Sequence, residues 1–450
     1  MNSRLYRRSA RAAARLLHPL VAAALLIVLA VPAFAQPKPC VAPLGWWESK
    51  GLMPFFINPK GNAPTTDCDF QLWSWSAFVH FMQPDPKSGA PMFLLLPTYD
   101  DLVSDKTRGP IAKPEALLKT RELSLRPRNE QPKSLGSFKQ AGPGGVLVDQ
   151  NGRSVYYATH MDPIYFNFTQ TYFGPNNYKK AAPTLNYPIG ATVIKSSWRI
   201  VAAGETVTDA YTTTATIALL ESDGKGKLKA SGKTQSGVKV ALVGIHVVGV
   251  IKDHPEFAWS TFEQLKNAPD LPANLTPNSP EPVSAQSYTF YKGGTPANVS
   301  NILPKTMTID PATQVIAPIT NVFQQFQYGG ATPALRVADI DSINANFQAT
   351  IKGQSPKVID PVFANYRLTG TVWMLPNTLV PGDGNMSEQA IGSIDLDNDT
   401  LETFVQGVGT NCFSCHTTSG HGTSYPGKNI NTSHIITSVL KPNPLILQSR

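Results

Sequence analysis

Long apolar runs are scarce in this chain of 450 residues. Beyond residue 35 no segment is apolar enough to cross a membrane as a helix, which takes about 20 consecutive apolar residues. The chain also has no internal repeat, no glycine-rich phosphate or dinucleotide loop and no Ser-His-Asp hydrolase signature. These absences argue against multi-span membrane proteins, repeat proteins and the common nucleotide-dependent enzymes.

The first 35 residues have the three parts of a secretory signal peptide. Residues 1–18 hold five arginines and no acid, residues 20–31 are apolar, and residues 32–35 read Pro-Ala-Phe-Ala. This pattern predicts cleavage after Ala35 and export to the periplasm. A membrane anchor is the alternative, but the apolar run is short for a span. We therefore expect no stable membrane anchor after cleavage.

Charge is nearly balanced once that segment is set aside. Residues 1–35 contain five of the 39 Lys and Arg residues and none of the 31 acids, so 34 bases against 31 acids leave +3. A balance this close to neutral gives no reason to expect nucleic acid as a partner.

Cysteine is rare, and two of the four cysteines form the most specific motif in the chain. The segment Cys412-Phe413-Ser414-Cys415-His416 has the C-x-x-C-H spacing that covalent haem attachment requires. Cys412 and Cys415 would each form a thioether with one haem c group, and His416 would be the proximal iron ligand. Cys40 and Cys68 remain, and in an oxidising compartment they are expected to form a disulfide, although two separate thiols stay open.

Other metal chemistry fits the sequence less well. A zinc site usually needs a fourth ligand and often a second cysteine pair, and a redox dithiol usually follows a strand in a βαβ unit. Neither context is present around Cys412 and Cys415. The Asp395-x-Asp397-x-Asp399 pattern resembles the start of a calcium loop but lacks its glycine and its final glutamate.

Sequence patterns predict a mainly β fold, with a sandwich-like β-rich body and few helices. The β-branched stretch over residues 238–251 suits a strand that is buried on both faces. Helices are predicted over residues 70–82 and 259–266, and a further short helix from Asp399 or Thr400 would lead into the motif. Residues 268–304 are rich in Pro, Asn and Ser and are predicted to be loop. We expect the body, of one or two subdomains, over residues 36–375 and a short helical haem-binding segment over residues 376–450.

The sixth iron ligand is not determined by the motif. Only 34 residues follow His416 and none is methionine, so upstream chain must cover the iron. His246 and Met386 are the favoured candidates, and an open or water-bound site is the third possibility. Four further histidines are weaker candidates: His80, His254, His421 and His434.

The C-terminal segment resembles that of large exported single-haem cytochrome c family proteins of Gram-negative bacteria. The resemblance rests on residues 400–404 and the 411–416 motif, with weaker similarity over residues 73–79, 194–199, 244–248 and 259–263. It implies a periplasmic haem protein with thioethers at Cys412 and Cys415 and with His416 as proximal ligand.

Two classes of function follow. The first is electron transfer, in which the haem passes single electrons to a periplasmic redox partner protein or small molecule. The second is a haem-dependent oxidoreductase, resembling a peroxidase, or a small-molecule sensor, either of which would have an open distal face. The long chain upstream of one haem keeps the second class open, so whether the protein is an enzyme is undecided.

Overall fold

The structure is a computed structural model that describes residues 39–42, 65–104, 145–331, 334–353, 358–438 and 440. The predicted signal peptide, residues 1–35, lies outside these residues. Residues 40–450 form one compact unit. None of the helices in the described ranges is long and apolar enough to span a membrane.

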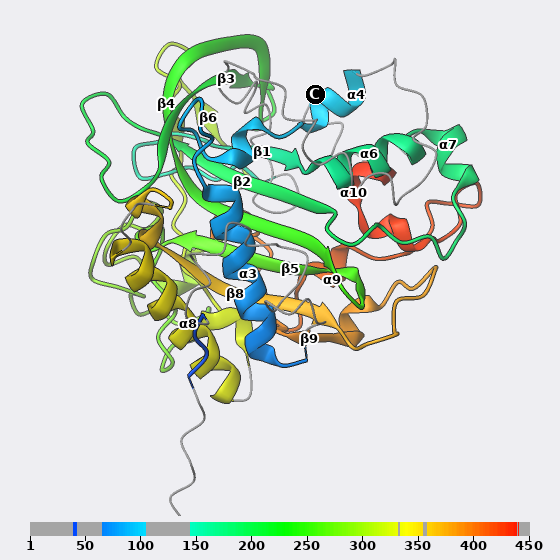
Figure 1. Ribbon diagram of the computed structural model, residues 1–450. Coiled ribbons are helices and arrows are strands. Elements are labelled where there is room, and N and C mark those ends of the chain that lie inside the picture. Colours follow the sequence, from blue (N-terminus) through cyan, green and yellow to red (C-terminus); the bar gives the residue numbers. More distant parts are fainter. Residues whose placement is uncertain are drawn as a thin grey trace, which may run out of the picture. The chain divides into compact units, whose positions relative to one another are not determined.

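An antiparallel sheet of seven strands forms the centre of this unit (Figure 1). Its order is β1-β2-β4-β5-β8-β9, and β3 also pairs with β4. The bounds are β1 (Val155–Met161), β2 (Thr192–Ile200), β3 (Thr212–Ser222), β4 (Leu228–Ile251), β5 (His254–Gln264), β8 (Tyr366–Met374) and β9 (Ala390–Gly392). A second, two-stranded sheet pairs β6 (Thr308–Ile309) with β7 (Ile316–Ala317).

The strands β5 and β8 and the second half of β4, residues 240–251, are buried on both faces. Because side chains alternate along a strand, odd-numbered and even-numbered residues of β4 from Ile245 onwards supply two different cores. Ile245 and Val247 belong to the first core, whereas Val248 and Val250 belong to the second. The sheet is therefore covered on both sides.

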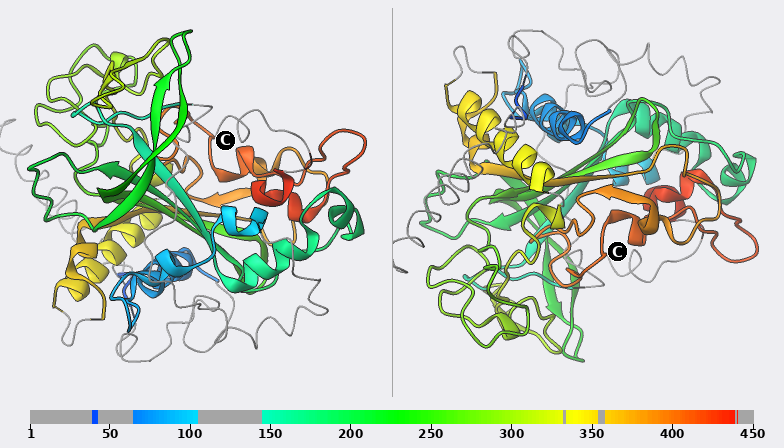
Figure 2. Two further views of the ribbon diagram at one scale, coloured as in Figure 1. Left: turned by 90° about the horizontal axis from the view of Figure 1, so that it is seen from above. Right: turned by 90° about the horizontal axis from the view of Figure 1, so that it is seen from below.

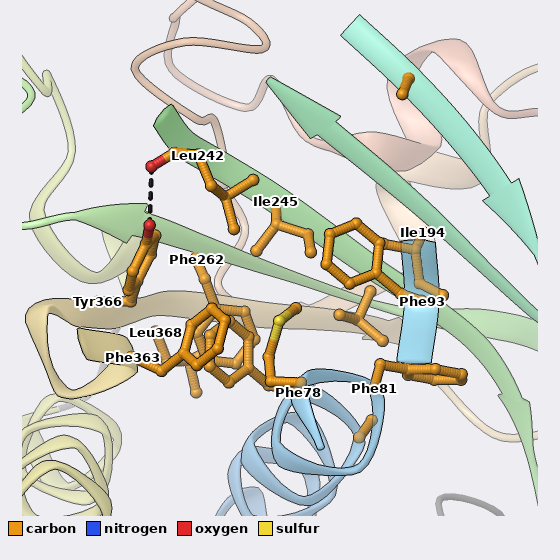
Figure 3. Close-up of a cluster of buried hydrophobic side chains, with 14 of the residues drawn as sticks. Phe78, Phe81, Phe93, Ile194, Leu242, Ile245, Phe262, Phe363, Tyr366 and Leu368 are labelled. Atoms are coloured by element: carbon orange, nitrogen blue, oxygen red, sulfur yellow. Dashed lines mark hydrogen bonds between the residues drawn. The ribbon is translucent and has the colours of Figure 1, made fainter. Parts of the chain in front are cut away.

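Two long helices cover the first face, α3 (Asp67–Met82) and α8 (Ala334–Gly353). The α3 helix begins at a capping box in which Thr66 and Asp69 bond each other's backbone amides. Its aromatic side chains meet the sheet, with the rings of Phe78 and Phe262 4.4 Å apart (Figure 3). This aromatic core fixes α3 against β5 and β8.

The opposite face carries α6 (Pro163–Tyr172), α7 (Pro175–Lys180) and the C-terminal segment. Figure 2 shows α3 and α8 on one side of the sheet and the orange-to-red C-terminal segment on the other. Trp259, Val372 and Phe413 share one buried cluster on this side. The remaining short elements are η1 (Met92–Leu95), α4 (Tyr99–Ser104), η2 (Ala297–Val299), η3 (Gln327–Gly330), η4 (Pro361–Asn365), η5 (Met386–Gln389), α9 (Cys412–Cys415), η6 (Asn429–Thr432) and α10 (His434–Thr437).

The expectation of a mainly β chain with few helices is confirmed, and so is the disulfide, whose Cys40 and Cys68 sulfurs are 2.00 Å apart. The sandwich-like packing differs, because helices and irregular chain cover the seven-stranded sheet. The helix predicted over residues 259–266 is wrong, since these residues fall almost entirely in β5. The helix expected from Thr400 is also wrong. Asn398 Oδ1 accepts the amides of Thr400 and Leu401, which makes a turn there instead.

Candidate haem-attachment site

The Cys-Phe-Ser-Cys-His motif forms a single helical turn, α9, on the second face of the sheet. Asn411 caps this turn, because its Oδ1 accepts the Phe413 amide at 3.0 Å while Ser414 Oγ accepts the Asn411 amide at 3.2 Å. Phe413 is fully buried, whereas the Cys412 thiol is half-buried and the Cys415 thiol is exposed. The turn thus anchors itself through Phe413 and presents both cysteines.

The His416 side chain is oriented by the tail that follows it. Its Nδ1 lies 2.9 Å from the Thr432 carbonyl oxygen, which can only accept, so Nδ1 carries the proton. Nε2 is therefore the nitrogen with a free lone pair. Burial, reinforced by the neighbouring His434, lowers the pKa of His416 well below its usual range. A neutral imidazole with its other nitrogen anchored is the form in which histidine binds a metal.

Two aromatic rings hold the His416 imidazole in place. The His434 ring stacks on it at 3.9 Å, and the Trp259 ring lies 4.2 Å away. His434 Nε2 also donates to the Cys415 carbonyl at 3.1 Å. The two rings are stacked with an interplanar angle of 19°, so His434 packs against His416 and supports its orientation.

The indole of Trp259 has a buried donor with no acceptor among the described residues. Its Nε1–H is shielded from solvent and makes no hydrogen bond. Such groups are rare, because each one costs about 1 to 3 kcal/mol. A haem carries two propionates that accept hydrogen bonds, so an unpartnered donor beside the His416 ring fits that group. The two thiols, the oriented imidazole and this donor together match the requirements of haem c.

A polar cluster lies on the same sheet face, close to the motif. His246 Nε2 is 3.0 Å from a Glu402 carboxylate oxygen, and Lys195 Nζ is 4.0 Å from the other. Lys195 and His246 are direct register partners on β2 and β4. Burial alone raises the pKa of Glu402, but the charge and hydrogen bond of His246 and the charge of Lys195 outweigh it and hold that pKa below its usual range.

The thiols respond to these charges. Burial raises the pKa of Cys412 well above its usual range and raises that of Cys415, and the negative charge of Glu402 adds to both shifts. A redox dithiol needs a thiolate near neutral pH, which this environment disfavours. Among the described residues no group of three or more His, Cys, Asp or Glu side chains is placed to hold a metal ion.

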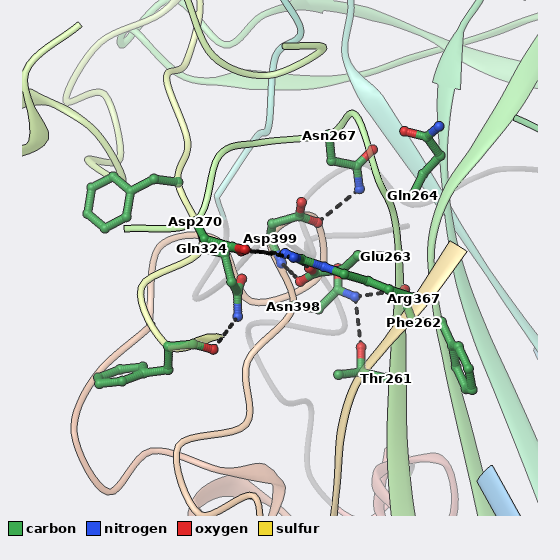
Figure 4. A network of polar contacts seen from close by, with 12 residues as sticks. Thr261, Phe262, Glu263, Gln264, Asn267, Asp270, Gln324, Arg367, Asn398 and Asp399 are labelled. Carbon is green, nitrogen blue, oxygen red and sulfur yellow. Dashed lines mark hydrogen bonds and ion pairs between the residues drawn. The ribbon is translucent and has the colours of Figure 1, made fainter. Parts of the chain in front are cut away.

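The chain that leads into the motif is fastened to the sheet by a buried polar network (Figure 4). Asn398 Nδ2 donates to Thr261 Oγ1 at 2.7 Å and to the Phe262 carbonyl at 3.1 Å. The Asp399 amide donates to Glu263 at 2.9 Å. These bonds join the segment directly to β5.

Arg367 on β8 supplies the positive charge of this network. It pairs with Glu263 at 3.2 Å and with Asp270 at 2.5 Å. Burial raises the pKa of Glu263 against the pull of Arg367, and burial together with the charge of Glu263 raises the pKa of Asp399. The calcium-like Asp pattern therefore serves as an anchor, since Asp399 Oδ1 accepts from Asn267 and Asp395 Oδ1 accepts the Gly409 amide.

Two glycines allow this close approach. A Cβ at Gly244 on β4 would lie 2.3 Å from Thr400 Oγ1, and one at Gly370 on β8 would lie 2.2 Å from Ser393 Oγ. Real Cβ contacts essentially never fall below 3.0 Å. The segment from Ser393 to Thr400 thus lies directly on the backbone of the sheet.

The favoured candidates for the distal ligand occupy different environments. His246 faces the polar cluster just described and bonds Glu402 through Nε2. Met386 is fully buried in η5, which packs against α9, and shares a cluster with Phe413. His254 pairs with Glu256 at 2.8 Å in a buried position. The structure thus brings both His246 and Met386 into the region around the motif.

Sequence reasoning had not singled out Trp259, Glu402 or Thr432 as members of this site. The strand register pairs His246 with Thr261, so Trp259, two residues along β5, faces the same side as His246. The sequence predicts a helix over residues 259–266 and therefore gives no signal for this placement. Glu402 and Thr432 give none either, since their roles depend on long-range folding. No family model, curated protein or solved structure matches this chain.

Proposed function

We propose that this protein is an exported c-type cytochrome that carries one covalent haem and passes single electrons between periplasmic redox partners. Cys412 and Cys415 would hold the haem as thioethers and His416 would ligate its iron. The proposal rests above all on the hydrogen bond from His416 Nδ1 to the Thr432 carbonyl, because it prepares Nε2 for a metal. The sequence spacing supports it independently.

When bound, the haem supplies one-electron redox chemistry. The chain's own residues bind and orient. Asn411 sets the start of α9, Thr432 fixes the His416 tautomer, and Trp259 offers a donor to a propionate. Met386 or His246 is the proposed source of the sixth ligand, and a methionine would give a higher potential than a histidine.

A second function, a haem enzyme or sensor with an open distal face, is favoured by the polar cluster of His246, Glu402 and Lys195. The imidazole of His246 is already engaged by a carboxylate through Nε2. A histidine held in this way acts as a positioned acid or base more readily than as a sixth ligand. The two functions therefore differ in the role of His246.

The first test is the optical spectrum of protein produced in a host that attaches haem to cytochromes, with Cys412→Ser/Cys415→Ser as the matched control. The proposal predicts a red protein with a low-spin reduced spectrum and little response to carbon monoxide. Colourless protein with two unmodified thiols by mass spectrometry would refute it. Fast carbon monoxide binding would favour the enzyme or sensor.

Two variants then identify the sixth ligand. His246→Ala converts the haem to the high-spin form if His246 is the ligand, and Met386→Leu does so if Met386 is the ligand. Met386→Leu keeps the apolar volume of a fully buried side chain, so the fold is retained.

A further inference from the structure

The part of the chain that carries the motif has a charge of opposite sign to the rest. Residues 375–440 contain six acids and one lysine, although the chain after residue 35 carries +3. The lysine is Lys428, whose ammonium is buried and donates to the Tyr178 and Ala181 carbonyls. The solvent-facing charge of this segment is therefore negative.

Not all six acids contribute to that surface. Asp397 and Asp399 are each 1% exposed, so neither presents its carboxyl group to solvent, and burial raises the pKa of both. The other four are at least partly exposed. They are Asp383, Glu388, Asp395 and Glu402.

Three of these acids, Asp383, Glu388 and Asp395, lie in segments that contact the motif or the residues beside it. Glu388 lies in η5, which packs on α9, and the backbone of Asp383 bonds Thr418, two residues after His416. Asp395 accepts the Gly409 amide just before the motif. Glu402 is paired with Lys195 and His246, which balance its charge, so it is not counted in this surface.

Two apolar side chains are exposed in the same segment of the chain as these acids. Val408 is 86% exposed and Ile394 is 38% exposed. Asn411 Nδ2 donates to the Ile394 carbonyl at 3.0 Å, and Val408 precedes Gly409, so both residues lie at the start of α9 beside the exposed Cys415. Apolar centres with a charged rim are typical of protein interfaces.

We propose that this surface, the acidic face, docks a positively charged redox protein at the exposed edge of the motif. The acidic face consists of Asp383, Glu388, Ile394, Asp395 and Val408. The inference rests on the proposed electron-transfer function and names the chemistry of its partner. A second copy of this chain is a poor occupant, because two negative rims repel each other.

A negative rim raises the local concentration of cations and lowers that of anions, and salt screens both effects. The haem-loaded protein is reduced and then oxidised by tris(phenanthroline)cobalt(III), a cation, or by hexacyanoferrate(III), an anion. Raising ionic strength should slow the first reaction and speed the second. Glu388→Lys should slow the cation reaction about fivefold to tenfold at low salt and speed the anion reaction.

Glu221→Lys is the matched control, because it makes the same charge change 17 register positions along β4 from His246, opposite Lys229. Its exposed pair with Lys229 contributes little to stability. If Glu388→Lys and Glu221→Lys change the two rates equally, the acidic face is not the site of approach and the inference is overturned.

Protein partners test the apolar centre. A cytochrome c of net positive charge should react faster than one of net negative charge, and Val408→Ser should slow the positive partner about fivefold without affecting either small ion. An unchanged rate with Val408→Ser, or a faster negative partner, overturns the docking surface while leaving the cytochrome intact. Protein that holds no haem overturns the proposed function itself.

Discussion

Asp397→Asn provides a test of how the haem-carrying segment is held. The Asp397 side chain is 1% exposed and one of its carboxylate oxygens has no hydrogen-bond partner. Burial, with the charge of Glu402 behind it, raises the pKa of Asp397 to about 9, although the Gly407 amide opposes the shift. Folding therefore forces a proton onto this carboxyl at neutral pH.

The direction of this pKa shift determines how the stability of the protein changes with pH. The folded pKa is above the unfolded value of 3.8, so the folded protein binds one more proton between these limits. The contribution of Asp397 to the free energy of unfolding is fully present below about pH 4. It falls by about 1.4 kcal/mol for each pH unit up to about pH 9. Asparagine resembles the protonated acid and does not titrate. Relative to the natural protein, Asp397→Asn should gain about 2 to 4 kcal/mol between about pH 4 and pH 7.

The assay is urea unfolding of both proteins at several pH values, followed by fluorescence of the seven tryptophans. The decisive quantity is how the difference in unfolding free energy between the two proteins changes with pH. The asparagine amide adds a cost of its own, but that cost does not depend on pH. Asp383→Asn is the control, since Asp383 is partly exposed. A difference between Asp397→Asn and the natural protein that stays flat from about pH 4 to pH 8 would refute the reasoning.

Three further changes test other parts of the fold by the same unfolding measurement. Arg367→Met leaves the buried Glu263 without its cation and should cost about 3 to 5 kcal/mol, so a cost below about 1 kcal/mol would contradict the network. Phe78→Ala empties the aromatic core beneath α3 and should cost about 3 to 5 kcal/mol, and an unshifted urea midpoint would count against that packing. Replacing Cys40 and Cys68 by serine opens a loop with a sequence separation of 28 and should cost about 3.5 kcal/mol, which reduction of the natural protein should reproduce.

Local signals predicted much of the structure. The helix predicted over residues 70–82 lies within α3, which begins at Asp67, and the buried strand predicted over residues 238–251 is the second part of β4, which begins at Leu228. The disulfide followed from cysteine counting. In each case the determining information lies within a short stretch of chain, such as the apolar run of β4.

Contacts between distant residues determined what the sequence could not predict. Residues 259–266 were predicted to be a helix, but pairing with β4 on one side and β8 on the other makes most of them a strand. Asn398 bonds the backbone of its own loop and that of β5, so it replaces the predicted helix with a turn. The Glu402 partner of His246 lies 156 residues away and no local pattern could reveal it.

The two glycines beneath the C-terminal segment limit which substitutions the sheet can accept. Gly244 and Gly370 lie outside the motif, yet each allows the segment over residues 393–400 to lie directly on the sheet. A methyl group at either position would displace this segment, because the space that it needs is already filled by the side chain of Thr400 or Ser393. Substitution of Gly244 or Gly370 should therefore displace the motif without altering any residue in it.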